Sequence, residues 1–240
     1  MINKELLLEV AKSKGLKNRE HIEKDYFQDL VLFHIYKLSN NFIFKGGTCL
    51  YKLYNMPRFS EDLDFSILED KNVEKTIENV AKKLEAKIEK RKTKSAYLFK
   101  LRFKGILTQA NTLRIDVSRI NIVFSFETKA YIPSYPEINI FHLRHLSLKE
   151  ILSEKIHALV KRNNARDLFD IFFLLRFTQF DENLTRKKFE IFKMKFDKNI
   201  LKEKINSIES KWEKELSPFL LTELPDFKIV KEFVAKKLLL

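Results

Sequence analysis

The chain has 240 residues, of which 45% are hydrophobic and 33% charged, a balance typical of a folded globular protein and not of a disordered one. The formal net charge is +13, which makes nucleic acid a candidate partner, although a composition rich in Lys and Phe gives the same sign without such a function. The single cysteine, Cys49, excludes an internal disulfide and fits a reducing cytoplasm, and no apolar run has the length of a membrane span.

Residues 1–146 are expected to mix helices and strands. In chain order the pattern predicts helices at 3–12 and 20–39, a strand at 42–44, a helix at 48–54, a strand at 63–68, a helix at 72–90, and strands at 96–104, 113–118, 122–132 and 138–142. Asn18 is the expected N-cap of the second helix. The strand at 96–104 alternates apolar residues with Lys100, Arg102 and Lys104, so one of its faces is basic.

The pattern becomes helical after Pro133 and Pro136. Ser147 and Glu150 have the spacing of a capping box, so a helix is expected to begin there. Further helices are expected from near Arg166 and at 185–197, 199–215 and 227–239. The sequence therefore predicts an α+β protein, with a mixed sheet and helices in residues 1–146 and a helical domain in 147–240.

Two of the chain's 4 glycines stand together, as Gly46 and Gly47, directly after the strand at 42–44. A turn without Cβ atoms lets the backbone approach a ligand closely and direct N–H groups at it. Most Gly-Gly pairs are only turns. The pair gains meaning here because a carboxylate pair follows on the next predicted strand.

Asp62 and Asp64 are two residues apart, so on a strand they share one face while Leu63 and Phe65 enter the core. Asp116 alternates in the same way with apolar neighbours on a later strand that can lie beside the first. Carboxylate oxygens suit Mg²⁺ or Mn²⁺, and substrate phosphates complete the shell. The alternative for Asp116 is a surface aspartate paired with Arg114 or Arg119.

These segments resemble a known family. Residues 44–48 followed by 58–65 are similar to motif I of the AbiEii/AbiGii-type nucleotidyltransferases, which include MenT-like toxins, in the DNA polymerase β-like superfamily. Residues 113–117 resemble motif II, with Arg114 where lysine is frequent. The segments at 21–25, 148–155 and 166–170 resemble the preceding helix, the later lysine-bearing helix and the final motif, so the resemblance covers about residues 21 to 176.

The resemblance implies roles for individual residues. Gly46, Gly47 and Thr48 would cradle the triphosphate of an NTP. Arg58 and Ser60 would contact the nucleotide, and Ser60 is also a possible phosphoryl acceptor. Asp62, Asp64 and Asp116 would bind Mg²⁺ or Mn²⁺, and Asp116 would also act as a base.

The helical half would supply a balancing cation. Lys155 would neutralise phosphate charge in the transition state, and Asp167 would orient Lys155 or contact the nucleotide. The alternatives are a solvated lysine and a structural Arg166–Asp167 ion pair.

The resemblance implies a metal-dependent nucleotidyltransferase that modifies an acceptor hydroxyl, with RNA such as the 3′ end of tRNA as the expected acceptor. A toxin of this kind would have a cognate antitoxin and no membrane partner. Two alternatives stay open: transfer of nucleotide or phosphate to a protein or to Ser60, and a non-catalytic module that binds nucleic acid or antitoxin.

Overall fold

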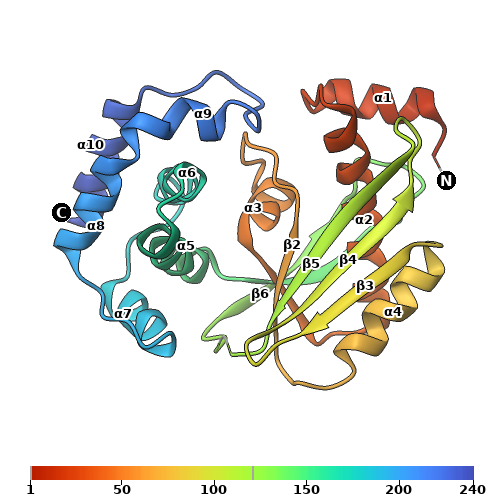
Figure 1. Cartoon of the computed structure of the whole chain (residues 1–240), viewed down its shortest axis with the longest axis horizontal. Coiled ribbons are helices and arrows are strands. Elements are labelled where there is room, and N and C mark those ends of the chain that lie inside the picture. The colour runs from red at the N-terminus through yellow and green to blue at the C-terminus, as the bar shows by residue number, and fades with distance from the viewer. Residues whose placement is uncertain (1, 121) are drawn as a thin grey trace. The chain divides into compact units, whose positions relative to one another are not determined.

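The computed structural model describes residues 2–120 and 122–240. The chain forms two compact units, of which the first contains Met1–Asn55 and Phe59–His145. The second contains Met56–Arg58 and Leu146–Leu240. Figure 1 traces both along the chain.

One mixed sheet is the framework of the first unit. Over the described residues its strands are β1 (Phe42–Lys45), β2 (Leu63–Ile67), β3 (Lys87–Lys92), β4 (Ala96–Lys104), β5 (Ala110–Ser118), β6 (Phe126–Tyr131) and β7 (Phe141–Leu146). They lie in the order β3-β4-β5-β2-β1-β7-β6. β2 is antiparallel to β1 and parallel to β5, which places β1 and β5 on either side of it.

The sheet has one buried and one open face in the region of β4 and β5. Phe99, Leu101 and Ile115 are buried, whereas Arg102 and Arg114 on the opposite face are exposed. This alternation is the period of two that a strand imposes on its side chains. In Figure 1 helix α2 (Arg19–Leu38) runs behind the strands, and its Phe27 stacks on Phe103 with ring centroids 4.1 Å apart. The open face therefore lies on the side of the sheet away from α2.

The remaining helices of this unit are α1 (Lys4–Ser13), α3 (Gly46–Tyr54) and α4 (Val73–Lys83). Asn18 caps α2 as predicted, because its side chain accepts hydrogen bonds from the backbone N–H groups of Glu20 and His21. α3 begins two residues earlier than predicted, since both glycines join its first turn.

The helix predicted at 72–90 is wrong in its second half. α4 ends at Lys83, Glu85 takes a φ of 52°, and β3 begins at Lys87. The backbone N–H of Ala86 bonds to the carbonyl of Ala81, which closes the helix end. Ile88 has the spacing of the next apolar residue in the helix, but in the structure it belongs to β3 and is the register partner of Leu101 in β4. Pairing with β4 makes residues 87–92 a strand, and the spacing of apolar residues along the chain does not reveal such a pairing.

A buried charge cluster joins α3 to α2. The Nζ of Lys52 lies 2.7 Å from Oδ1 of both Asp25 and Asp29, and all three residues are almost entirely buried. The hydroxyls of Tyr131 and Tyr135 donate to Asp29 and Asp25, at 2.8 and 2.6 Å. Burial by itself would lower the pKa of Lys52, but the two carboxylates outweigh it and raise that pKa, so Lys52 stays charged.

The turn between β1 and α3 is fixed by Gly46. Its φ is +76°, a conformation that L side chains rarely adopt. A Cβ at this position would lie 2.3 Å from Oδ2 of Asp64 on the neighbouring strand β2. Backbone conformation and space therefore both require glycine, and the start of α3 is held directly against Asp64.

The second unit is helical. Its helices are α5 (Leu148–Arg162), α6 (Ala165–Leu174), α7 (Glu182–Ile191), α8 (Lys198–Ser207), the 3₁₀ turn η1 (Glu209–Lys211), α9 (Trp212–Leu216) and α10 (Phe227–Leu238). The predicted helix start at Ser147 is confirmed, because the side chain of Ser147 accepts a hydrogen bond from the backbone N–H of Glu150. Lys188 of α7 inserts its Nζ 2.6 Å from Glu150 of α5, and both side chains are fully buried.

The α+β class predicted from the sequence is confirmed, with the mixed sheet in the first unit and the helices after Ser147 in the second. Over the described part of the chain, the helices are either too short or too polar to cross a lipid bilayer.

Replacing Lys52 by Ala should lower the free energy of unfolding by about 3–5 kcal/mol, because Asp25 and Asp29 would lose the cation they share in a buried site. The matched control is Lys90→Ala, which breaks exposed ion pairs with Glu74 and Glu78. Urea titration of both variants measures the difference. Equal stability of the two variants would contradict the structural role given to Lys52.

Gly46→Ala should cost more stability than Gly15→Ala. Both positions have a positive φ, +76° and +72°, so each pays a backbone strain of about 1–2 kcal/mol. Only the new Cβ at Gly46 also collides with Asp64, and such overpacking adds about 1–3 kcal/mol. Urea titration of the two variants tests this, and an identical loss would show that Asp64 moves aside without cost.

Candidate active site

Parallel pairing of β2 with β5 brings two of the predicted carboxylates together. Asp64 and Asp116 are direct register partners, as are Leu63 and Ile115 one position earlier. Leu63 and Ile115 are buried with no exposed surface, so the two aspartates project from the open face. Two strands far apart in the sequence therefore present neighbouring carboxylates about 5 Å apart in backbone spacing.

Asp62, the third predicted carboxylate, lies one residue before β2 and is held by Arg114. The Nε of Arg114 donates to Oδ1 of Asp62 at 3.0 Å, and its Nη2 donates to Oδ2. Arg119 bonds instead to Asp70. The alternative in which Arg114 or Arg119 pairs with Asp116 is therefore not what the structure shows.

Asp116 differs electrostatically from an ordinary surface aspartate. Burial raises its pKa above the usual value, and the nearby charge of Asp62 raises it further. The Arg114 guanidinium partly opposes this rise. The site thus concentrates negative charge that a cation would relieve.

The carboxylate oxygens of this site are ligands of the type that a hard divalent cation prefers. Asp64 and Asp116 offer oxygen ligands on adjacent strands, and Mg²⁺ in proteins is commonly held by one or two carboxylates together with water and substrate phosphate. Among residues 2–120 and 122–240, no cluster of three or more Asp, Glu, His or Cys side chains is arranged as a complete metal site. A substrate phosphate would have to supply part of the shell.

The predicted phosphate cradle lies next to these carboxylates. α3 begins at Gly46, which packs against Asp64, so the positive end of the helix faces the same place. Thr48 is fully buried, and its hydroxyl donates to the backbone carbonyl of Asp62. Thr48 therefore ties the start of α3 to the segment before β2.

The segment carrying Ser60 is held from α2. The side-chain amide of Gln28 donates to the carbonyl oxygens of Ser60 and Glu61, at 2.8 and 3.0 Å. Lys24 forms an ion pair with Glu61 at 2.6 Å. Gln28 and Lys24 are not predicted from the sequence as positioning residues, although Lys24 lies in the segment at 21–25 that resembles the family.

One buried network of ion pairs in the helical unit contains three of the predicted site residues, Arg58, Lys155 and Asp167. Arg58 makes a forked contact with Asp170, at 2.8 Å from Nη2 to Oδ1 and 2.9 Å to Oδ2. Lys155 bridges Asp170 and Asp167, at 2.6 and 3.2 Å. Asp167 also bonds to Arg162, not to Arg166 as the alternative reading supposed.

The charges in this network hold one another in place. Burial would raise the pKa of Asp167, but Lys155 and Arg162 outweigh it and lower that pKa to about 2. Lys155 is 8% exposed, so it is not the solvated lysine of the alternative reading. Asp170, the shared partner of Arg58 and Lys155, was missed as a site residue, although its spacing from Asp167 places both on one helix face.

Comparison with curated proteins by sequence gives no significant match. The fold is similar to that of several solved structures, including MenT4 and JHP933. MenT4, a nucleotidyltransferase toxin from Mycobacterium tuberculosis H37Rv, aligns with a TM-score of 0.69 and 19% identity, over 97% of this chain and 88% of that one. JHP933 from Helicobacter pylori aligns with a TM-score of 0.64 and 18% identity, over 92% of this chain and 91% of that one.

The family model described as nucleotidyl transferase AbiEii toxin, type IV toxin–antitoxin system, matches residues 30–233. That range includes the glycine turn, the three aspartates and the buried Arg58–Asp170–Lys155 network. It covers most of the chain, in agreement with the fold similarity to a nucleotidyltransferase toxin. The chain therefore belongs to the AbiEii family of nucleotidyltransferase toxins.

Proposed function

We propose that this protein transfers a nucleotidyl group from an NTP to an acceptor hydroxyl, with Mg²⁺ or Mn²⁺ bound at Asp64 and Asp116 and assisted by Asp62. The observation that carries the proposal is the register of Asp64 opposite Asp116, directly beside the Gly46 turn. Membership of the AbiEii family and the fold similarity to MenT4 support it.

The proposed reaction is an in-line displacement at the α-phosphorus. The acceptor oxygen forms a bond to that phosphorus, the bond from the α-phosphorus to the oxygen bridging to the β-phosphate breaks, and pyrophosphate leaves with the electron pair. The acceptor proton passes to a carboxylate oxygen of Asp116. A divalent ion at the site would polarise the phosphate oxygens and neutralise charge on the leaving group.

The chain's own groups have distinct tasks in this proposal. Backbone N–H groups at the start of α3 bind phosphate oxygens, because a helix N-terminus carries unpaired donors and partial positive charge. Gly46 keeps those donors beside Asp64. Arg114 balances the charge of Asp62 through its two hydrogen bonds to that carboxylate.

RNA is the proposed acceptor class, with the 3′ end of tRNA as the leading candidate. The net charge of +13 and the basic residues of β4 favour a polyanionic partner. Between Lys71 and Lys104 there are 12 Lys and Arg against 4 Asp and Glu. Because the family is described as part of type IV toxin–antitoxin systems, we also propose a cognate antitoxin and a cytoplasmic site of action.

Incubation of the protein with each α-³²P-labelled NTP, Mg²⁺ and total cellular RNA tests the function. We expect label to be incorporated into RNA, and we expect no incorporation when EDTA is present during the incubation. Label in protein, including the enzyme itself at Ser60, would instead support transfer to protein. The absence of label in both fractions, with RNA or antitoxin binding retained, would support a non-catalytic binding module.

Asp64→Asn and Asp116→Asn should each lower the transfer rate about 10²–10³-fold, as loss of one group that stabilises transition-state charge commonly does. The matched control is Asp70→Asn, which removes an exposed carboxylate paired with Arg119 and should leave the rate unchanged. Initial rates under saturating NTP measure the effect, with circular dichroism to show that each variant is folded. Full activity of Asp64→Asn would contradict the two-carboxylate site.

A further inference from the structure

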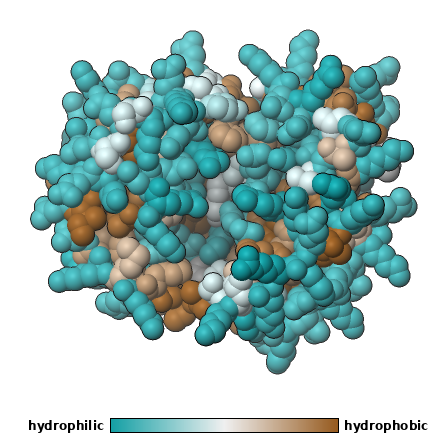
Figure 2. Space-filling model, viewed as in Figure 1, coloured by the Kyte–Doolittle hydropathy of each residue, from teal (hydrophilic) through white to brown (hydrophobic). Residues whose placement is uncertain are grey.

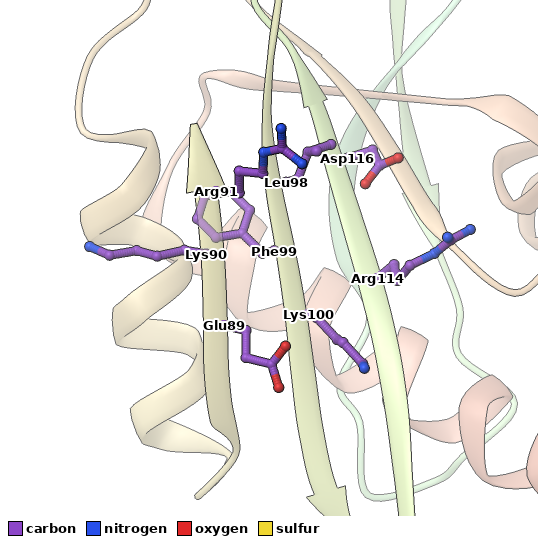
Figure 3. Close-up of a pocket in the computed structure, with 8 residues that line it drawn as sticks. All are labelled: Glu89, Lys90, Arg91, Leu98, Phe99, Lys100, Arg114 and Asp116. Carbon is purple, nitrogen blue, oxygen red and sulfur yellow. The ribbon is translucent and has the colours of Figure 1, made fainter. Parts of the chain in front are cut away.

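A pocket opens on the face of the sheet beside Asp116. Its volume is about 330 Å³, and it is lined by Glu89, Lys90, Arg91, Leu98, Phe99, Lys100, Arg114 and Asp116. Figure 3 shows that these residues come from the three neighbouring strands β3, β4 and β5. The volume is at the lower end of small-ligand sites, so it suits a unit of about the size of one nucleoside.

Strand register places this pocket in line with the carboxylates. Arg91 pairs with Leu98, Leu98 with Asp116, and Asp116 with Asp64. Because neighbouring strands are about 4.8 Å apart, Leu98 is one strand and Arg91 two strands from Asp116. On the other side of Asp64, Lys45 and the Gly46 turn complete the row. The carboxylates therefore lie between the phosphate-binding turn and the pocket.

In-line displacement relates the order of turn, carboxylates and pocket to the position of the acceptor. The attacking hydroxyl must approach the α-phosphorus from the side opposite to the leaving pyrophosphate. If the triphosphate lies on the Gly46 turn, the hydroxyl arrives from the β5–β4 side, where the pocket is. The acceptor, and not the NTP, is thus the natural occupant.

The charges of the pocket favour a polyanion. Arg91 and Lys100 line the pocket and Arg102 lies outside its lining on β4, and within the described residues these three form no ion pair with a carboxylate. Glu89, the register partner of Lys100, is the lining carboxylate of β3, and Lys90 is paired with Glu74 and Glu78. Figure 3 shows Lys90 directed away from the other lining side chains. In Figure 2 hydrophilic side chains cover most of the visible surface over the sheet. These cations are available for phosphate.

The floor of the pocket suits a base. Leu98 is an apolar side chain on an otherwise charged face, and Figure 3 shows the Arg91 guanidinium beside it. A flat guanidinium next to an aliphatic surface is a combination on which an unpaired base can stack. A base held inside a duplex would not present its face to this floor.

We infer that the pocket between β3 and β5 binds the 3′-terminal nucleotide of a single-stranded RNA end. The terminal base lies on Leu98 and Arg91, Lys100 and Arg102 contact the preceding phosphates, and the ribose hydroxyl reaches Asp116. This inference rests on the proposed nucleotidyl transfer to RNA, for which it names the form of the acceptor.

The test is binding of a fluorescein-labelled 12-nucleotide single-stranded RNA with a free 3′ end, measured by anisotropy without NTP. Arg91→Ala combined with Lys100→Ala should weaken binding at least about tenfold and lower the slope of log K against log salt by about 1.4, the value for two single-strand phosphate contacts. Lys92→Ala, the matched control, removes an exposed positive charge of β3 that does not line the pocket, and it should change binding less than twofold. A blunt-ended RNA hairpin should bind the wild type more weakly than the single strand.

Kinetics separate this inference from the proposed function. In the transfer assay the double variant should raise KM for RNA about tenfold and leave kcat at saturating RNA nearly unchanged. If the wild type transfers nucleotide but the double variant matches Lys92→Ala in both binding and KM, the pocket assignment is overturned. If the wild type transfers nothing while the double variant still loses binding of the single strand, the proposed function fails and the pocket stands as an RNA-end site.

Discussion

The contact between Gly46 and Asp64 is the constraint on which the candidate site depends. A glycine with a φ of +76° lies so close to Asp64 that no side chain fits between them. The start of α3 is thereby held against β2, and a helix N-terminus and a carboxylate are kept within one small region. The partial positive charge of the helix start favours the carboxylate of Asp64, and the same region offers N–H donors for phosphate and oxygen ligands for a cation.

The α2 helix supplies the support behind that contact. Asp25 and Asp29 hold Lys52 in α3 through buried ion pairs, while Gln28 holds the backbone before β2. Glu23 accepts hydrogen bonds from the backbone N–H groups at 106–108, in the turn between β4 and β5. One helix therefore fixes the three segments that carry the turn, the first aspartates and Asp116. Buried charges make these contacts at a desolvation cost that their partners offset.

The helical unit repeats this use of buried charge. Arg58 and Lys155 neutralise Asp167 and Asp170 away from water, and Arg162 adds a contact to Asp167 from an exposed position. Lys155 is held by two carboxylates, and its ammonium group is fixed in position as a result. The roles predicted for Arg58, Lys155 and Asp167 toward the nucleotide stay predictions, and the structure adds Asp170 as the residue that links them.

Much of the local structure followed from the sequence alone. Alternation around Asp64 and Asp116 determined which side chains enter the core, because a strand has a period of two whatever its partners are. Asn18 and Ser147 fixed two helix starts through short-range hydrogen bonds to nearby N–H groups. The glycine pair and the Asp-x-Asp spacing identified the family and the chemistry it implies.

Only the tertiary structure decided which of these pieces meet. The parallel pairing of β2 with β5 places Asp64 beside Asp116, although the two residues are 52 positions apart in the sequence. No local sequence pattern determines which strand lies next to another. The same limit explains why the helix predicted at 72–90 extends wrongly over residues 87–90, since only their pairing with β4 makes them a strand. The burial of Arg58 against Asp170 likewise depends on a contact 112 residues apart. Local preferences act over a few residues, whereas the site is built from long-range contacts that the packing of the whole chain selects.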